Sequence, residues 1–190
     1  MKLLIIDNFD SFTYNLKYYA EKFCSQVVVK RNDDISLDEI AYYDGFIISP
    51  GPGLPENTGI VKPAIRHFKS TKKILGICLG HQAIAQVFGA KLSNLDFPLH
   101  GVAIPTFLNA DLDPIFMGIP PKINSGRYHS WVVDKQSLEL SPLLITATDK
   151  YGQVQALKHQ NYNIRSLQFH PESILTDSGL KMIENWVRNC

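Results

Sequence analysis

The sequence is poor in the features that mark secreted and membrane-spanning proteins. It has three cysteines, at positions 24, 78 and 190. The cysteines are odd in number and far apart, so they do not form a disulfide framework, and such usage is typical of a reducing compartment. A run of about 18 apolar residues, which a membrane-spanning helix needs, is missing. The apolar stretch at the N-terminus is too short for a signal peptide. We therefore expect a cytoplasmic protein with no membrane association.

The sequence also lacks a charge imbalance. Lys+Arg 19 against Asp+Glu 18 leaves a formal net charge of +1, so nothing predicts binding to nucleic acid or to an anionic membrane surface. A hydrophobic content of 45% and a charged content of 19% are ordinary for a globular chain. Because internal repeats and low-complexity segments are absent too, we expect one domain over residues 1–190.

Short apolar runs alternate with helix-like segments in the first half of the chain. The uncharged runs at 3–6, 46–49 and 74–77 predict strands that are buried on both faces, as in parallel sheets. The pattern of apolar residues predicts helices over 11–23, 37–42, 60–68, 82–88 and 178–187. Further strand-like segments lie at 26–30 and, in the second half, at 102–108, 122–128, 131–133, 143–148, 153–157 and 164–169. We predict a three-layer α/β fold, with a mostly parallel central sheet flanked by helices and an antiparallel extension.

A cysteine lies between two glycines where a predicted strand turns into a helix. In Gly76-Ile77-Cys78-Leu79-Gly80, the glycines remove the Cβ atoms that would clash in a sharp turn. This is the nucleophile-elbow arrangement with sulfur in place of a hydroxyl. The following helix N-terminus favours a thiolate and offers free N–H groups. A buried cysteine in an ordinary strand–helix turn is the alternative.

Two other loops follow strands of the predicted sheet. Pro50-Gly51-Pro52-Gly53-Leu54-Pro55 is a rigid loop at the carboxyl edge of a strand, where α/β ligand sites lie. His170-Pro171-Glu172 ends the last strand. In extended chain, the first and third of these side chains point the same way, so the carboxylate can orient the imidazole. A thiol, a histidine and a carboxylate are the parts of a nucleophilic triad, although a turn with a satisfied histidine is the alternative for this motif alone.

Taken together, these motifs resemble the class I (triad-type) glutamine amidotransferases. The resemblance rests on residues 76–82, on Pro50-Gly51-Pro52-Gly53 and on Gln168-Phe169-His170-Pro171-Glu172-Ser173. The stretches at 6–15, 30–33, 127–130 and 172–176 narrow it to the glutaminase subunits of anthranilate synthase and of aminodeoxychorismate synthase. It covers the whole chain and implies a flavodoxin-like fold. The sequence departs from the family pattern at Trp131, at Arg165-Ser166-Leu167 and at Val102-Ala103, none of which touches the triad.

The resemblance implies a role for each matching residue. Cys78 is the expected nucleophile, His170 the acid and base, and Glu172 the group that orients the histidine. The backbone N–H groups of Gly53 and Leu79 are expected to form the oxyanion hole. The residues expected to bind glutamine are Gly51, Pro52, Gly53, Gln82, Ser130 and Trp131.

The implied activity is hydrolysis of L-glutamine through a Cys78 thioester, with ammonia passed to a chorismate-binding synthase subunit. We expect a heterodimer or heterotetramer with that component I, and an anthranilate synthase of tryptophan biosynthesis. The alternative is an aminodeoxychorismate synthase of the folate pathway, or a component that both enzymes share. No cofactor is expected in this chain, whereas the partner is expected to need Mg²⁺. Less favoured interpretations are a cysteine peptidase or γ-glutamyl hydrolase, and a non-catalytic binding subunit.

The other histidines have weaker functional signals. His81 is expected to be structural, and His67 and His159 are expected at the surface. A metal site formed by Cys78, His81 and His170 is conceivable from the ligand types. It is disfavoured because a bound zinc ion would disable the nucleophile and a fourth ligand is missing.

Overall fold

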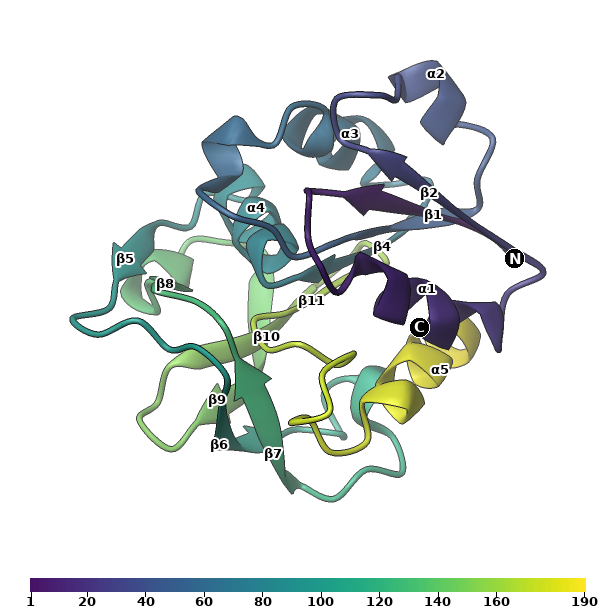
Figure 1. The fold of residues 1–190 in the computed structure, drawn as a ribbon. Coiled ribbons are helices and arrows are strands. Elements are labelled where there is room, and N and C mark those ends of the chain that lie inside the picture. The colour runs from purple at the N-terminus through teal and green to yellow at the C-terminus, as the bar shows by residue number, and fades with distance from the viewer.

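The computed structural model describes residues 1–190 and is built around a nine-stranded sheet (Figure 1). Its strand order is β2-β1-β3-β4-β11-β10-β9-β6-β7. The first five strands in this order are parallel and the remaining four are antiparallel. Their bounds are β1 (Lys2–Asp7), β2 (Gln26–Arg31), β3 (Gly45–Ile48), β4 (Lys73–Ile77), β6 (Val102–Leu108), β7 (Lys122–Arg127), β9 (Leu143–Asp149), β10 (Val154–His159) and β11 (Ile164–Leu167).

Helices cover both faces of the parallel part of the sheet. On one face, α1 (Thr13–Glu21) contacts α5 (Gly179–Asn189), and both contribute to one apolar cluster. On the other face lie α2 (Leu37–Ile40), α3 (Val61–Phe68) and α4 (Leu79–Val87). Figure 1 shows these two groups on opposite sides of the sheet. The predicted three-layer fold with an antiparallel extension is therefore confirmed.

The parallel strands carry apolar side chains on both faces of the sheet, and helices cover both faces. Within β1, Leu3 and Ile5 belong to the cluster under α1 and α5, whereas Leu4 and Ile6 belong to the cluster under α3 and α4. All four side chains are fully buried. Since successive side chains of a strand point to opposite faces, an uninterrupted apolar run is what a doubly covered strand requires.

Smaller elements connect the sheet to the loops. A separate two-stranded sheet pairs β5 (Leu92–Asn94) with β8 (Trp131–Val133). The short 3₁₀ helices are Pro55–Asn57, Pro114–Phe116 and Gln136–Leu138. None of the helices is long and apolar enough to cross a lipid bilayer.

Three expectations about the elements were wrong in detail. The segment at 131–133 does not join the main sheet but pairs with β5, a strand that was not predicted. The helix after Cys78 starts at Leu79 rather than at residue 82, and the last strand ends at Leu167 rather than at residue 169. The last two differences place Cys78 and Gln168 directly at element ends, where their side chains can leave the regular structure.

The parallel strands bring the predicted motifs to one edge of the sheet. β3 ends just before Pro50, β4 ends just before Cys78, and β11 ends just before Gln168. These three strands are neighbours in the sheet. Because they run in the same direction, the segments that follow them meet at the carboxyl edge.

Candidate active site

Cys78 occupies a strained backbone position at the start of α4. Its φ is 51° and its ψ is −100°, a conformation that residues with a Cβ atom seldom adopt. A Cβ atom on Gly76 would lie 2.4 Å from the carbonyl oxygen of Gly80, and one on Gly80 would lie 2.6 Å from the carbonyl oxygen of Ile48. Both glycines are therefore required for the close approach of strand and helix, and the sharp strand–helix turn predicted from the sequence is confirmed.

His170 and Glu172 form a buried pair beside this turn. The distance from His170 Nδ1 to Glu172 Oε1 is 2.7 Å, and their side chains are 3% and 0% exposed. The pairing predicted from the sequence is therefore present, but the extended chain from which it was predicted is not. The chain is not extended here, because Ser173 N–H donates to His170 O and closes a turn. The second ring nitrogen, Nε2, is buried and has no partner in the protein.

The charges around His170 favour its protonated form. Burial lowers the pKa of His170, but the neighbouring Cys78 sulfur and the Glu172 carboxylate outweigh burial and raise it above its usual value. At neutral pH the imidazole is therefore held as an imidazolium next to the sulfur. Such a pair stabilises a thiolate and can protonate a leaving group.

Two aromatic rings pack against the His170 imidazole. The ring of Tyr128 lies 4.8 Å from the imidazole, centroid to centroid, and the ring of Phe12 lies 6.2 Å away in a T-shaped arrangement. The Tyr128 hydroxyl is 3.1 Å from Ser173 Oγ, which ties this ring to the loop that carries Glu172. These contacts restrict the motion of the imidazole.

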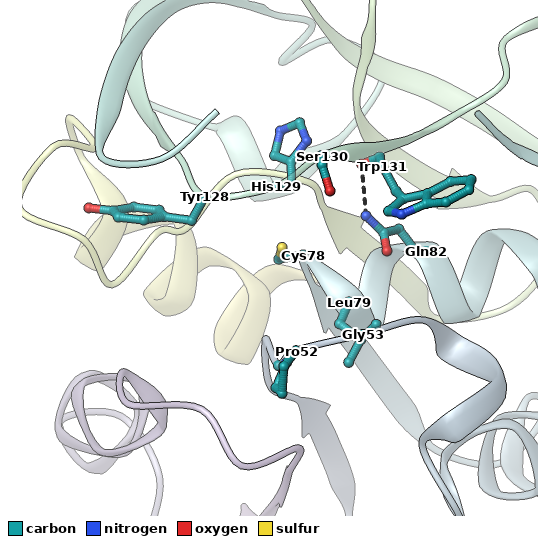
Figure 2. A pocket seen from close by; sticks show the side chains of 10 residues that line it. Pro52, Gly53, Cys78, Leu79, Gln82, Tyr128, His129, Ser130 and Trp131 are labelled. Atoms are coloured by element: carbon teal, nitrogen blue, oxygen red, sulfur yellow. Dashed lines mark hydrogen bonds between the residues drawn. The ribbon is translucent and has the colours of Figure 1, made fainter. Parts of the chain in front are cut away.

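Cys78 borders two cavities. The first, of about 150 Å³, is lined by Gly51, Pro52, Gly53, Cys78, Leu79, Gln82, Tyr128, His129, Ser130 and Trp131. Figure 2 shows the Cys78 sulfur pointing into the space between Pro52–Gly53 and the segment from Tyr128 to Trp131. The second cavity, of about 430 Å³, is lined by both Cys78 and His170 and also by Phe9, Asp10 and His100. The structure therefore brings together every residue that the sequence predicted for glutamine binding.

Two backbone N–H groups beside Cys78 are free to bind an anion. Neither Gly53 nor Leu79 donates a hydrogen bond to the protein backbone. Gly53 has a φ of 80°, which favours glycine, and nothing lies within 4 Å of the position of its Cβ. The N–H of Leu79 belongs to the first turn of α4, where the helix dipole favours negative charge. This geometry fits an oxyanion hole.

Side-chain amides connect the first cavity to the sulfur. Gln82 Nε2 donates to the Trp131 carbonyl oxygen over 2.9 Å and lies 3.3 Å from Gln168 Oε1. Gln168 Nε2 in turn donates to Cys78 Sγ over 3.7 Å. No role was predicted for Gln168 from the sequence, although its place two residues before His170 at the end of a strand was a usable signal.

The remaining histidines are uncharged or remote. Burial is the main cause that lowers the pKa of His81 and of His129 to about 3, so both are neutral at physiological pH. His81 Nδ1 lies 2.9 Å from Ser166 Oγ and ties α4 to β11, as expected for a structural residue. His67 is exposed as expected, but His159 is 5% exposed and packs against Phe88. The surface prediction for His159 was therefore wrong, since an aromatic cluster buries it.

The other two cysteines lie in a different environment. Cys24 and Cys190 are free and partly buried against the core under α1 and α5. Burial raises the pKa of both thiols, that of Cys190 to about 11. Their thiolates are therefore scarce at neutral pH. No group of three or more His, Cys, Asp or Glu side chains is arranged to hold a metal ion.

The backbone strain at Cys78 leads to a stability prediction. At most positions alanine is more favourable than glycine by about 0.5–1 kcal/mol. At position 78 we expect the reverse, with Cys78→Gly more stable than Cys78→Ala by about 1 kcal/mol, because only glycine relieves the positive φ. Urea denaturation of both variants measures this difference. An alanine variant at least as stable as the glycine variant would show that the backbone relaxes and stores no strain.

The chain is similar to known proteins over nearly its whole length. Residues 4–190 match the family model of the class I glutamine amidotransferases. The chain is 42% identical to anthranilate synthase component 2 of Cyanophora paradoxa, over 99% of this chain and 98% of the relative. It is also 42% identical to aminodeoxychorismate/anthranilate synthase component 2 of Bacillus subtilis (strain 168), over 97% of this chain and 95% of the relative. A solved structure from Thermoplasma acidophilum, described as part of a GMP synthase, superposes with a TM-score of 0.86 at 26% identity, over 98% of this chain and 92% of the other.

Proposed function

Since the chain belongs to the class I glutamine amidotransferases, we propose that its Cys78, His170 and Glu172 hydrolyse L-glutamine and that the ammonia serves a synthase subunit. The observation that carries these roles is the His170–Glu172 pair beside the strained Cys78, with His170 and Cys78 lining one cavity. Residues 1–190 act in this proposal as one amidotransferase domain.

The proposed reaction has two steps. The Cys78 thiolate attacks the carboxamide carbon of glutamine, and the N–H groups of Gly53 and Leu79 stabilise the oxyanion. His170 then protonates the amide nitrogen, ammonia leaves and a glutamyl thioester remains. In the second step, His170 takes a proton from water, the hydroxide attacks the thioester, and glutamate and the thiolate are released. The chain needs no cofactor for either step.

The cavity favours free glutamine over a peptide substrate. It measures about 150 Å³ and has Pro52 on one side and Trp131 on the other. A volume of this size suits a single amino acid rather than a length of polypeptide. This supports the amidotransferase reaction over a cysteine peptidase or a γ-glutamyl hydrolase, and the complete triad argues against a non-catalytic binding subunit.

The names of the relatives support a synthase partner that uses chorismate. We propose that the chain is the glutaminase component of an anthranilate synthase in tryptophan biosynthesis. The alternative is an aminodeoxychorismate synthase, or a component shared by both, since the Bacillus subtilis relative carries both names and the Klebsiella aerogenes aminodeoxychorismate synthase component 2 is 38% identical. Reconstitution with each purified synthase subunit, with glutamine as the nitrogen source, separates these possibilities by the product that forms.

The second cavity beside Cys78 supports a proposal for the face that docks the partner. Phe9 lines it, is 51% exposed and has a φ of 62°, which is unusual for a bulky residue. The guanidinium of Arg31 lies 5.1 Å from its ring and holds it in place. An exposed, fixed aromatic ring loses little entropy when an interface covers it. We propose that Phe9, the loop at 50–55 and His100 form the docking face.

The docking face can be tested by one substitution. We expect Phe9→Asp to weaken binding of the synthase subunit by about 10- to 100-fold, because it removes a central apolar contact. Aspartate tolerates a positive φ better than phenylalanine, so the fold should survive. Isothermal titration calorimetry with the synthase subunit measures the affinity.

Tyr42 supplies the matched control for this test. It is 80% exposed and precedes β3, at the opposite edge of the sheet. Tyr42→Asp should bind as the wild type does. Equal affinity of the Phe9→Asp variant and the wild type would remove Phe9 from the interface.

A further inference from the structure

Gln168 is a fully buried polar residue that touches the nucleophile. It directly follows β11 and is 0% exposed. Its backbone is held on both sides, because Cys78 N–H donates to Leu167 O over 2.8 Å and Gln168 N–H donates to Gln155 O over 2.9 Å. The side chain therefore starts from a fixed point and reaches Cys78 Sγ at 3.7 Å. The fold therefore fixes this amide next to the Cys78 sulfur.

The orientation of the Gln168 amide is determined by the backbone. The carbonyl of Trp131 can only accept a hydrogen bond, so the amide nitrogen of Gln82 must face it. The same nitrogen lies 3.3 Å from the Gln168 side chain, which must therefore present its oxygen. The nitrogen of Gln168 is then left to face the sulfur. The chain of contacts from Trp131 through Gln82 aims a donor at Cys78.

We propose that Gln168 is a catalytic residue that donates a hydrogen bond to the Cys78 thiolate, and that Gln82 is a positioning residue that keeps this donor in place. The role rests on the proposed glutaminase function. A hydrogen bond to an anion is stronger than one to a neutral thiol, so the amide favours the ionised sulfur. The hydrogen bond from Gln168 acts when the resting Cys78 thiolate forms and again when hydrolysis of the thioester releases the thiolate.

The chain of contacts from Trp131 through Gln82 and Gln168 to Cys78, called the relay below, also connects substrate binding to the sulfur. Its far end is the carbonyl of Trp131, next to Ser130, in the segment expected to bind glutamine. A displacement of this carbonyl would release Gln82 and then Gln168. In this proposal, glutamine bound against the segment would hold the carbonyl in place and so keep the donor aimed at the sulfur.

The titratable groups around Cys78 stay the same in every variant of the test. Those that share a cavity with it, or pair with one that does, are Asp10, His100, Tyr128, His129, His170 and Glu172. Because none of them is altered, a change in the ionisation of Cys78 between variants reports on the amides alone.

The experiment measures the alkylation rate of Cys78 by iodoacetamide as a function of pH. Iodoacetamide is a small neutral probe, and peptide-resolved mass spectrometry separates Cys78 from Cys24 and Cys190. In Gln168→Met, which keeps the length of the side chain but removes the donor, we expect the midpoint of the profile to rise by about one pH unit. The kcat for glutamine should fall about tenfold, with a smaller change in KM.

Gln155→Met is the matched control. Gln155 is also a fully buried glutamine, on the neighbouring strand β10, but its amide donates to Asp149 instead of Cys78. This variant should keep the midpoint and the kcat of the wild type. An equal shift in both variants would mean that any loss of a buried amide disturbs the sheet, and it would overturn the proposal.

Gln82→Leu tests the positioning role and covers the case in which Gln168→Met does not fold. We expect its midpoint to rise as well, and the double variant to show no more than the shift of Gln168→Met alone. An unchanged midpoint in a folded Gln168→Met, or in Gln82→Leu if that alone folds, would overturn the relay. A wild-type protein that does not hydrolyse glutamine would instead contradict the proposed function, and the alkylation profiles would still decide the role of Gln168.

Discussion

Replacement of Cys78 by serine is expected to abolish glutamine-dependent activity, with a loss of at least about 10⁴-fold in kcat. A serine hydroxyl has a far higher pKa than a thiol, and the imidazolium of His170 cannot hold it as an anion. The backbone strain at this position remains, because serine also carries a Cβ atom. The fold and the cavity should therefore be preserved while the chemistry is lost.

Two measurements check this prediction on the complex with the synthase subunit. The first is product formation from glutamine, which should disappear. The second is product formation from added ammonium salt, which should survive because the proposed synthase site lies on the other chain. Loss of both activities would show that Cys78 is needed for assembly rather than for hydrolysis.

A glutamine-like electrophile provides an independent check. In the wild type it should modify Cys78 alone, since burial raises the pKa of the thiols of Cys24 and Cys190. In the serine variant no adduct should form. An unmodified Cys78 in the wild type would contradict every interpretation in which this residue is the nucleophile.

The elements that follow from local physical rules were predictable from the sequence. The uncharged run from Leu3 to Ile6 indicates a strand covered on both faces, because no polar side chain has to reach water. Gly76 and Gly80 indicate the sharp turn at Cys78, because only glycine leaves room for the backbone oxygens that lie there. In both places the cause acts within a few residues.

The parts that depend on distant contacts were not predictable. β5 is three residues long and exists because it pairs with β8, about 40 residues away. His159 packs against Phe88, which directly follows α4, and the sequence around His159 gives no sign of this contact. The role of Gln168 depends on Gln82 and Trp131, which come from two other segments of the chain.

The second large effect is expected from a comparison of His170→Ala with Glu172→Gln. The alanine variant loses the group that protonates the leaving ammonia, so kcat should fall about 10³- to 10⁴-fold. The glutamine variant keeps an oxygen that can accept from Nδ1, so the ring stays oriented and the loss should be smaller, about 10²-fold. The amide NH₂ would then take the place of Oε2, a buried atom without a partner, which adds a cost in stability.

The pH profile separates the two roles of Glu172. Its negative charge is one of the causes that raise the pKa of His170, so a neutral amide should lower that pKa. The reaction needs the imidazolium as an acid, and its loss appears as the alkaline limb of the profile of kcat/KM. This limb should therefore move to lower pH in Glu172→Gln. An unmoved limb together with a loss as large as that of His170→Ala would show that Glu172 takes part in proton transfer itself, because orientation and charge alone cannot produce that combination.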